Sequence, residues 1–397
     1  MVTTENTILI AGGGIGGLAA ALAAAEAGHQ VSVFEQAPQF GEVGAGIQMA
    51  PNAMAVLTRL GVAERVKEFS VFPKRLVLKD AFSGEELSAL DLGDEFKERY
   101  GFPYIVLHRS DLHRALLEAC EANPNISLYT DTRIESAEEV EDGAIFINQH
   151  GEKIKGKAVI GADGIKSNVR KLFTQDEMIC SEYVAYRGTI PIEEVSEDAE
   201  MDDVIMWIGP NLHVVQYPVR RGELYNQVVV FKSPNYTPDT LEWGTPEEMD
   251  QVFAGCCDKV EKALSFINKD FRWPMYDRLP INNWTKGKIT LLGDAAHPML
   301  QYLAQGGVQA LEDADKLADA LKANGEDFEA AFKEYQEERI PRSARVQTSA
   351  RTWGEIIHAV DPISILLRND IMKNREANDF SYTDWIYGNK RNLVTTK

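Results

Sequence analysis

The stretch TILIAGGGIGGLAAAL, residues 7–22, decides the fold of this chain. Residues 8–11 form a short apolar run, which predicts a buried parallel strand. Three glycines at GxGxxG spacing follow, and the alanine-rich segment that begins at Gly17 predicts a helix. A second apolar run at residues 31–34 predicts the next strand and ends at the carboxylate of Glu35. This order of strand, glycine turn, helix, strand and acidic residue is typical of a nucleotide-binding unit.

Each part of this unit has a physical role in binding a dinucleotide. Gly12 permits the tight turn, Gly14 lets a pyrophosphate approach the backbone, and Gly17 lets the helix pack closely on the strand. The helix N-terminus offers free N–H groups to the phosphates, and we count Ile15, between these glycines, among the cofactor-binding residues. Glu35 can accept hydrogen bonds from ribose hydroxyls. The alternative is a glycine-rich turn without a ligand, which the strands and the helix around it disfavour.

The composition is that of a folded protein with an acidic surface. Its 397 residues suggest two or three domains, and 44% of them are hydrophobic. The net charge of −20 makes nucleic acids and anionic membranes poor partners. The four cysteines form no CxxC pair, so we expect no metal site and no disulfide framework, and a reducing cytoplasm fits. Residues 6–25 are uncharged but too weakly apolar for a membrane span, and no Lys or Arg precedes them as in a signal peptide.

Two further motifs follow short apolar runs far downstream. The first, GADG at residues 161–164, places Asp163 in a turn between a predicted strand and a short helix. The second, GDAAHP at residues 293–298, places Asp294 at the end of another predicted strand. Three elements that can bind phosphate or ribose groups are more than a simple dehydrogenase needs.

With these motifs in this order, the chain resembles the single-component FAD-dependent aromatic hydroxylases, the group A flavoprotein monooxygenases typified by 4-hydroxybenzoate and salicylate hydroxylases. The resemblance covers nearly the whole chain. Its supporting stretches are GEVGAG (41–46), HRSDLH (108–113), AYRG (185–188), WPMYDR (273–278) and YTDW (382–385).

The resemblance implies an α/β fold. A Rossmann-like FAD-binding domain, with the fold of 4-hydroxybenzoate hydroxylase, would carry an inserted β-rich substrate domain and a helical C-terminal region. The expected bounds are 1–73, 100–180 and 282–352 for the FAD-binding domain, 74–99 and 181–281 for the substrate domain, and 353–397 for the C-terminal segment.

The resemblance also implies which residues hold FAD. Asp294 would bond the ribityl or ribose hydroxyls, Asp163 would lie near the pyrophosphate, and Arg109 would reach FAD from the side. The other implied contacts are Gly46 and the backbone of Gly306, Gly307 and Val308, which would face the isoalloxazine. A helix N-terminus there would favour the anionic reduced flavin, because it carries about half a positive charge. Turn-forming roles for the two aspartates, and a surface ion pair for Arg109, are the alternatives.

The implied reaction is the hydroxylation of a phenolic aromatic acid with NADH and O₂ through a flavin C4a-hydroperoxide, as in aromatic catabolism. The chain has one GxGxxG fingerprint, so NADH, expected over NADPH, would bind transiently. The resemblance favours conversion of 3-hydroxybenzoate into 2,5-dihydroxybenzoate (gentisate), and hydroxylation of salicylate or 6-hydroxynicotinate is the alternative. A non-catalytic flavin-binding sensor of aromatics, or a flavin halogenase or dehydrogenase, would be a different class. The family favours homodimers.

Such a reaction needs a polar group at the substrate hydroxyl. A phenol has a pKa of about 10 and a histidine of about 6.5, so full proton transfer would cost about 4–5 kcal/mol unless the site stabilises the phenolate. Residues 212–219 predict a strand, whose period of two places His213, Val215 and Tyr217 on one face. We predict His213 as the base and Gln301 as a second hydrogen-bonding group; a structural core histidine is the alternative. The predicted substrate contacts are Tyr217, Tyr104 and Val215.

Overall fold

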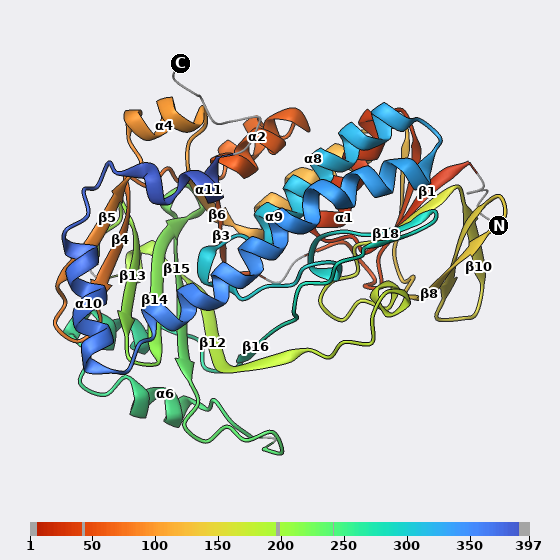
Figure 1. Ribbon diagram of the computed structural model, residues 1–397. Coiled ribbons are helices and arrows are strands. Elements are labelled where there is room, and N and C mark those ends of the chain that lie inside the picture. The colour runs from red at the N-terminus through yellow and green to blue at the C-terminus, as the bar shows by residue number, and fades with distance from the viewer. Residues whose placement is uncertain (1–5, 42–43, 196–198, 241, 389–397) are drawn as a thin grey trace.

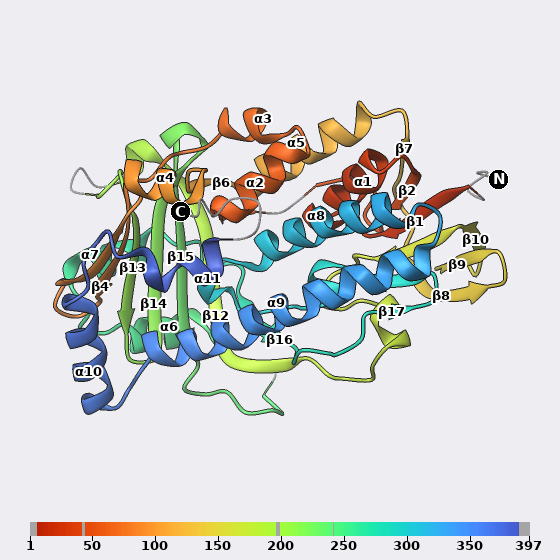
Figure 2. The same ribbon diagram turned by 45° about the horizontal axis from the view of Figure 1, so that its top comes forward.

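The computed structural model describes residues 6–41, 44–195, 199–240 and 242–388. Within these residues two large sheets lie toward opposite ends of the molecule, and long helices run between them (Figure 1). A second view shows the same separation, with the N-terminal half beside α1 and α8 and the β-rich half beside α10 (Figure 2). The expected α/β class, with a β-rich second region and a helical C-terminal region, is confirmed.

The first sheet is the parallel sheet that the opening stretch predicts. Its strand order is β17-β18-β11-β1-β2-β7, and each neighbouring pair is parallel except β17 with β18. The strands are β1 (Thr7–Ala11), β2 (Gln30–Phe34), β7 (Ile126–Tyr129), β11 (Ala158–Gly161), β17 (Thr285–Lys286) and β18 (Ile289–Leu291). The three sequence motifs follow β1, β11 and β18, which are neighbours. Because the carboxyl ends of parallel strands meet at one edge of a sheet, the three motifs meet there as well.

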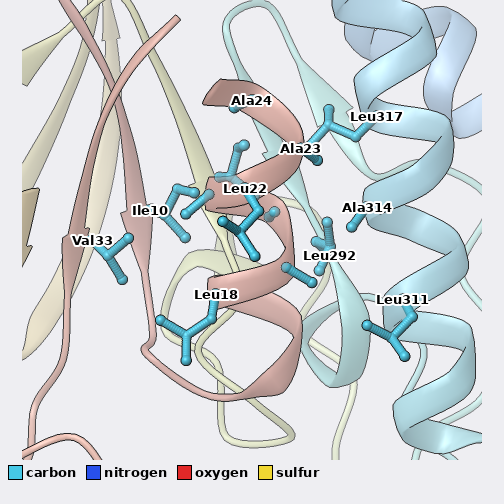
Figure 3. Packing of buried hydrophobic residues seen from close by; sticks show 14 of the residues in the cluster. Ile10, Leu18, Leu22, Ala23, Ala24, Val33, Leu292, Leu311, Ala314 and Leu317 are labelled. Carbon is cyan, nitrogen blue, oxygen red and sulfur yellow. The ribbon is translucent and has the colours of Figure 1, made fainter. Parts of the chain in front are cut away.

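Helix α1 (Ile15–Glu26) lies between this sheet and helix α8 (Gly306–Asn324). Figure 3 shows its side chains between Ile10 and Val33 of the sheet on one side and α8 on the other. Most of the α1 residues are buried, as expected for a helix that is apolar on all sides. Its alanines let the two helices approach closely. The helix begins at Ile15, before the predicted start, because Gly14 takes the N-cap position.

Shorter elements surround this core. A small antiparallel sheet has the order β10-β9-β8, and β3 pairs with β6. These strands are β3 (Gly46–Met49), β6 (Ile105–His108), β8 (Ile134–Val140), β9 (Gly143–Asn148) and β10 (Lys153–Gly156). The helices of this half are α2 (Pro51–Arg59), α3 (Ala63–Lys67) and α5 (Arg109–Glu121).

The second sheet has seven strands in the order β16-β12-β15-β14-β13-β4-β5. They are β4 (Arg75–Asp80), β5 (Glu86–Asp91), β12 (Ile179–Pro191), β13 (Val204–Gly209), β14 (Leu212–Val219), β15 (Leu224–Lys232) and β16 (Trp273–Asp277). A hairpin joins β14 to β15 through Arg220–Gly222. One face of the sheet packs on α6 (Pro246–Val252) and α7 (Asp258–Ser265). Residues of the opposite face are therefore available to line a site.

The C-terminal region is mainly helical. Its helices are α9 (Phe328–Ile357), α10 (Pro362–Lys373) and α11 (Asp384–Tyr387), and α11 packs beside α4 (Asp94–Tyr100). Helix α9 runs through residue 353, and the domain bounds given above stay a prediction. No helix among the described residues is long and apolar enough to cross a membrane.

Candidate functional site

One large cavity opens between the two sheets. Its volume is about 1270 Å³, which exceeds the about 300–1,000 Å³ of a pocket for one drug-sized ligand, so a cofactor and a substrate can fit together. Of the predicted site residues, those that line it are Gly12, Gly14, Ile15, Glu35, Gly46, Tyr104, Arg109, Asp163, His213, Val215, Tyr217, Asp294, Gln301, Gly306 and Gly307. Gly17 and Val308 do not line it, because Gly17 packs on the glycine turn and the Val308 side chain lies in the core.

The glycine turn has the geometry that its sequence predicts. Gly12 has a φ of +103°, and a Cβ there would lie 2.3 Å from the carbonyl oxygen of Ala162. A Cβ on Gly17 would lie 1.9 Å from the carbonyl oxygen of Gly12, so the helix approaches the turn too closely for a side chain. Glu35 accepts hydrogen bonds from the N–H groups of Gly13 and Ala37, both at 2.8 Å. Each carboxylate oxygen can accept a further bond, which leaves the predicted ribose contact open.

Asp163 has the contacts of a residue that stabilises its own turn. Its carboxylate accepts the hydroxyl of Ser167 at 2.5 Å and the N–H groups of Asn168 at 2.8 Å and Val169 at 3.3 Å. Burial raises the pKa of this carboxyl above its usual range, whereas these hydrogen bonds work to lower it. The alternative of a turn-forming role therefore explains these hydrogen bonds. Asp163 nevertheless lines the cavity, so the predicted position near the pyrophosphate stays open.

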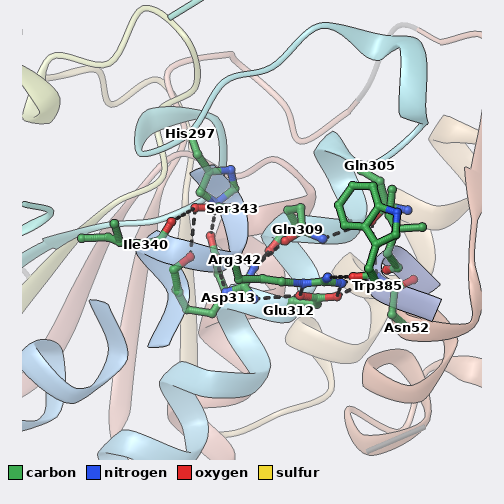
Figure 4. Close-up of polar contacts among 12 residues, drawn as sticks. Asn52, His297, Gln305, Gln309, Glu312, Asp313, Ile340, Arg342, Ser343 and Trp385 are labelled. Carbon is green, nitrogen blue, oxygen red and sulfur yellow. Dashed lines mark hydrogen bonds and ion pairs between the residues drawn. The ribbon is translucent and has the colours of Figure 1, made fainter. Parts of the chain in front are cut away.

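An ionic network that the sequence analysis missed holds the start of α8 (Figure 4). Arg339 of α9 bonds Glu312 and Asp313 of α8, each at 2.7 Å. Asn52 donates to Glu312 at 2.6 Å and to Gln305, the residue before α8, at 3.3 Å. Burial alone would raise the pKa of Glu312, but the guanidinium groups around it lower it to about 2. The network fixes the N-terminus of α8 against α2 and α9.

Asp313 also holds the GDAAHP motif. Its Oδ2 atom accepts the N–H of Gly293 at 2.9 Å and lies 2.6 Å from Nε2 of His297. His297 is fully buried, so it supports the turn and cannot reach a substrate. The side chain of Asp294, between them in sequence, is exposed and lines the cavity.

The C-terminal segment forms part of the cavity wall. Trp385, Ile386 and Tyr387 of α11 line it, and Arg342 of α9 donates to the carbonyl oxygens of Trp385 and Ile386. Tyr387 packs edge-on against Tyr104, with ring centroids 5.8 Å apart. The same network that holds α8 therefore also holds this wall, because Arg342 binds Glu312 as well, at 3.0 Å.

Strand β14 presents the predicted residues to the cavity. His213, Val215 and Tyr217 all line it, as the period of two predicts. His213 is also buried, and its Nδ1 atom lies 2.7 Å from Nε2 of His358. Burial lowers the pKa of His213 well below its usual range. His213 therefore has features of both predicted roles. It lines the cavity, as a base would, and it is buried with a hydrogen-bond partner, as a structural core histidine would be.

Gly46 joins the two halves of the site. A Cβ at this position would lie 2.5 Å from the ring of Tyr217, and the N–H of Gly46 donates to Asn226 at 2.6 Å. Tyr104 donates to Gln48, on the same strand as Gly46, at 2.6 Å. The glycine therefore lets strand β3 pass directly against the tyrosine of the second sheet.

Arg187 is a site residue that the sequence analysis did not single out. It lines the cavity from β12 and donates through Nη2 to Oε1 of Gln301. Its Nε atom has no hydrogen-bond partner, and no carboxylate of the described residues forms an ion pair with it. Burial lowers the pKa of this guanidinium, and the charge of Arg109 adds to that effect. A lone arginine within an otherwise weakly polar strand, in the AYRG stretch, was the signal that could have identified it.

The register of the second sheet places Arg187 on the same face as His213, Val215 and Tyr217, two strands away from β14. Arg187 pairs with Val228 of β15, which pairs with Val215 of β14. Directly paired residues share a face, and two strand spacings amount to about 10 Å. His213 and Tyr217 stand about 7 Å from Val215 along β14. The cavity floor thus carries an imidazole, a phenol and a guanidinium around one apolar residue.

The two histidines of the HRSDLH stretch have structural contacts. His108 caps α5, accepting the N–H of Ser110 at 3.3 Å. His113 bonds the carbonyl oxygen of Gly13 at 2.7 Å. Neither lines the cavity. No group of three or more His, Cys, Asp or Glu side chains that could hold a metal ion occurs in the described part of the chain.

The residues of the cavity fit FAD. The N-termini of α1 and α8 both open on it, and neither has a side-chain cap, so their N–H groups can bind phosphate or flavin oxygens. The turn at Gly12 leaves no room for a side chain, because a Cβ there would meet the backbone of Ala162. Together with the fold, these features define an FAD-binding protein.

Comparison with known proteins agrees with this class. The chain belongs to the FAD binding domain family, which matches residues 5–350. It is 41% identical to the 3-hydroxybenzoate 6-hydroxylase of Polaromonas naphthalenivorans (strain CJ2) over 382 residues, 96% of this chain and 95% of that protein. It is 38% identical to 3-hydroxybenzoate 6-hydroxylase 1 of Aquipseudomonas alcaligenes, across 97% of this chain and 98% of that one.

Solved structures show the same fold. HpxO of Klebsiella pneumoniae, complexed with FAD and uric acid, superposes with a TM-score of 0.83 at 26% identity, over 93% of both chains. A salicylate hydroxylase substrate complex superposes with a TM-score of 0.79 at 23% identity, over 98% of this chain and 97% of that one. The expected family, FAD as cofactor and aromatic hydroxylation are thereby confirmed.

Proposed function

We propose that the protein hydroxylates 3-hydroxybenzoate to 2,5-dihydroxybenzoate, with NADH and O₂ as co-substrates. The observation that carries this proposal is that His213 and Arg187 lie on the same face of the second sheet and line one cavity. Arg187 is partly buried, and a cation removed from water without a carboxylate partner is costly unless a ligand supplies the negative charge. Three relatives named as 3-hydroxybenzoate 6-hydroxylases, 36–41% identical to this chain, support the choice of substrate.

In this proposal Arg187 binds the carboxylate of the substrate and His213 accepts a hydrogen bond from its hydroxyl. Tyr217, Val215 and Tyr104 shape the pocket, and Gln301 supplies a second polar contact. Burial lowers the pKa of His213, so complete proton transfer from a phenol would cost more than the about 4–5 kcal/mol for unperturbed groups. The guanidinium offsets part of this cost by stabilising negative charge on the substrate. His213 therefore polarises the hydroxyl through a hydrogen bond and raises the electron density of the ring.

FAD, when bound and reduced by NADH, supplies the oxygen chemistry. The glycine turn of Gly12 and Gly14 and the helix start at Ile15 would hold it, with Gly17 packed behind the turn and Glu35 at the ribose. Asp294 would bond its sugar hydroxyls, and Arg109, Asp163 and Gly46 would flank it. The backbone of Gly306, Gly307 and Val308 would face the flavin ring, with the Val308 side chain in the core, and the positive end of α8 would favour a negative charge there.

Substrate-panel kinetics test this function directly. We expect purified protein to be yellow, to oxidise NADH faster when 3-hydroxybenzoate is present, and to form 2,5-dihydroxybenzoate, identified by mass spectrometry. Salicylate and 6-hydroxynicotinate are the comparison substrates, and NADPH is the comparison reductant. Faster turnover and coupled product from either comparison substrate would replace 3-hydroxybenzoate. Aromatic binding without stimulated NADH oxidation would indicate a sensor instead.

We also propose that the protein is a homodimer in the cytoplasm. Helix α10 exposes Ile363, Leu366, Leu367 and Ile371, each 58–67% exposed and all on one helix face. Such a stripe suits a twofold contact with the same stripe of a second copy. Use of NADH and four free thiols support a reducing compartment.

A further inference from the structure

His213 lines the cavity and also has a buried side-chain partner. Its Nδ1 atom lies 2.7 Å from Nε2 of His358, and the two rings are inclined by 21°. Stacked rings touch at about 3.5–4.0 Å, so atoms this close belong to rings that meet edge to edge in a hydrogen bond. His358 directly follows α9, and its carbonyl oxygen accepts the N–H of Asn211, at the turn before β14, at 3.1 Å. Side chain and backbone thus both tie residue 358 to the strand that carries His213.

Two tyrosine rings hold this pair of imidazoles in place. Tyr183 stacks on His358 with ring centroids 4.5 Å apart. Tyr302 meets both imidazoles edge-on, at 5.1 Å from His358 and 5.6 Å from His213. The exposed fractions are 1% for His213 and 4% for His358, so bulk water does not compete for the hydrogen bond between them. The orientation of His213 is therefore determined by packing as well as by this bond.

The groups around the pair keep both imidazoles neutral. Burial and the nearby charge of Arg368 lower the pKa of His358 to about 3. Arg368 lies on α10 and donates to the carbonyl oxygens of Ile356, at 3.3 Å, and Ile357, at 3.0 Å. Burial raises the pKa of the Tyr183 and Tyr302 phenols, which are neutral as well. A single proton therefore lies in the bond between the two imidazoles.

The direction of this hydrogen bond decides what His213 can do. A neutral imidazole has one N–H and one lone pair, and the bond made by one nitrogen sets the state of the other. If Nδ1 of His213 donates to His358, Nε2 of His213 has the lone pair and can accept a bond from a substrate hydroxyl. If His358 donates instead, Nε2 carries the proton and cannot accept.

We propose that His358 is a positioning residue: it accepts the Nδ1 proton of His213 and leaves the Nε2 lone pair of His213 for the substrate hydroxyl. The proposal rests on the proposed function of this site and extends it to a side chain that lies 145 residues away in sequence. His358 itself does not line the cavity, so it acts only through His213.

Two substitutions separate this role from a packing role. His358→Leu removes the acceptor and keeps an apolar side chain; we expect kcat for hydroxylation to fall about 10- to 100-fold, with FAD affinity unchanged. His358→Gln can place an amide oxygen where Nε2 lies and should restore most of the kcat. Tyr183→Phe is the control, because it keeps the stacked ring, and it should retain the wild-type kcat. Wild-type kcat in His358→Leu, or no restoration in His358→Gln, would overturn the proposal.

A second readout needs no turnover. Nitrogen NMR of protein labelled at its seven histidines reports which nitrogen of each imidazole carries the proton. We expect His213 to carry it on Nδ1 in the wild type and in His358→Gln, and His213 protonated on Nε2 in the wild type would overturn the proposal even if no variant folds. This measurement stands apart from the substrate panel, which can reject 3-hydroxybenzoate while the proton on His213 is still found on Nδ1.

Discussion

Replacing Arg187 by Met should weaken substrate binding without lowering the stability of the protein. A charged hydrogen bond to a carboxylate is worth about 1.5–3 kcal/mol. At about 1.4 kcal/mol for each factor of ten, its loss raises KM for an anionic substrate about 10- to 150-fold. The free energy of unfolding should not fall along with the affinity for the substrate. Arg187 has no carboxylate partner among the described residues, so removing its partly buried charge relieves a desolvation cost that offsets the about 1 kcal/mol lost with the bond to Gln301.

The assay compares KM for 3-hydroxybenzoate with KM for its neutral analogue 3-hydroxybenzyl alcohol. The wild type should prefer the acid, and Arg187→Met should lose this preference while its unfolding midpoint in urea stays level or rises. Arg272→Met is the matched control, because that guanidinium pairs with Glu242 at 3.0 Å outside the cavity and should change neither quantity. An unchanged KM for the acid in Arg187→Met would refute the carboxylate site, and a large loss of stability would show that the guanidinium of Arg187 is already stabilised in the free protein.

Four further changes test other parts of the site. His213→Ala should retain FAD, seen in the flavin spectrum, and lower kcat for hydroxylation about 10²- to 10⁴-fold; unchanged coupled turnover would remove the imidazole from the mechanism. Gly46→Ala puts a Cβ 2.5 Å from the ring of Tyr217, which should cost about 1–3 kcal/mol and lower the melting temperature; an equal melting temperature would contradict the close approach. Glu312 has a folded pKa of about 2 against an ordinary value of 4.5, so its stabilisation is complete above about pH 4.5 and is lost as the pH falls through about 2. Glu312→Gln should therefore lower the free energy of unfolding by about 3 kcal/mol near neutral pH and make it depend less on pH in acid. If the stability of the variant falls with decreasing pH as steeply as that of the wild type, the network does not have this role. Leu366→Glu, on the exposed face of α10, should convert a dimer into monomers in light scattering; monomeric wild-type protein would refute the proposed contact.

Local sequence was sufficient where the physics is local. The glycine turn needs a positive φ at Gly12 and no side chain at Gly17, and both conditions follow from residues within a few positions of each other. The alternation along β14 identified the shared face of His213, Val215 and Tyr217, because a strand repeats every two residues whatever lies beside it. The acidic pair in α8 was not recognised, because its partners come from α2 and α9.

By itself the sequence determined the nucleotide-binding unit, the two further motifs after short apolar runs and the shared face of His213, Val215 and Tyr217. Only the tertiary structure decided which faces meet. Arg187 reaches Gln301 across 114 residues, and His213 reaches His358 across 145. Periodicity records which way a side chain points, but the order of strands in a sheet and the docking of a distant helix depend on how the whole core packs, and that packing brought the cation, the imidazole pair and the cavity together.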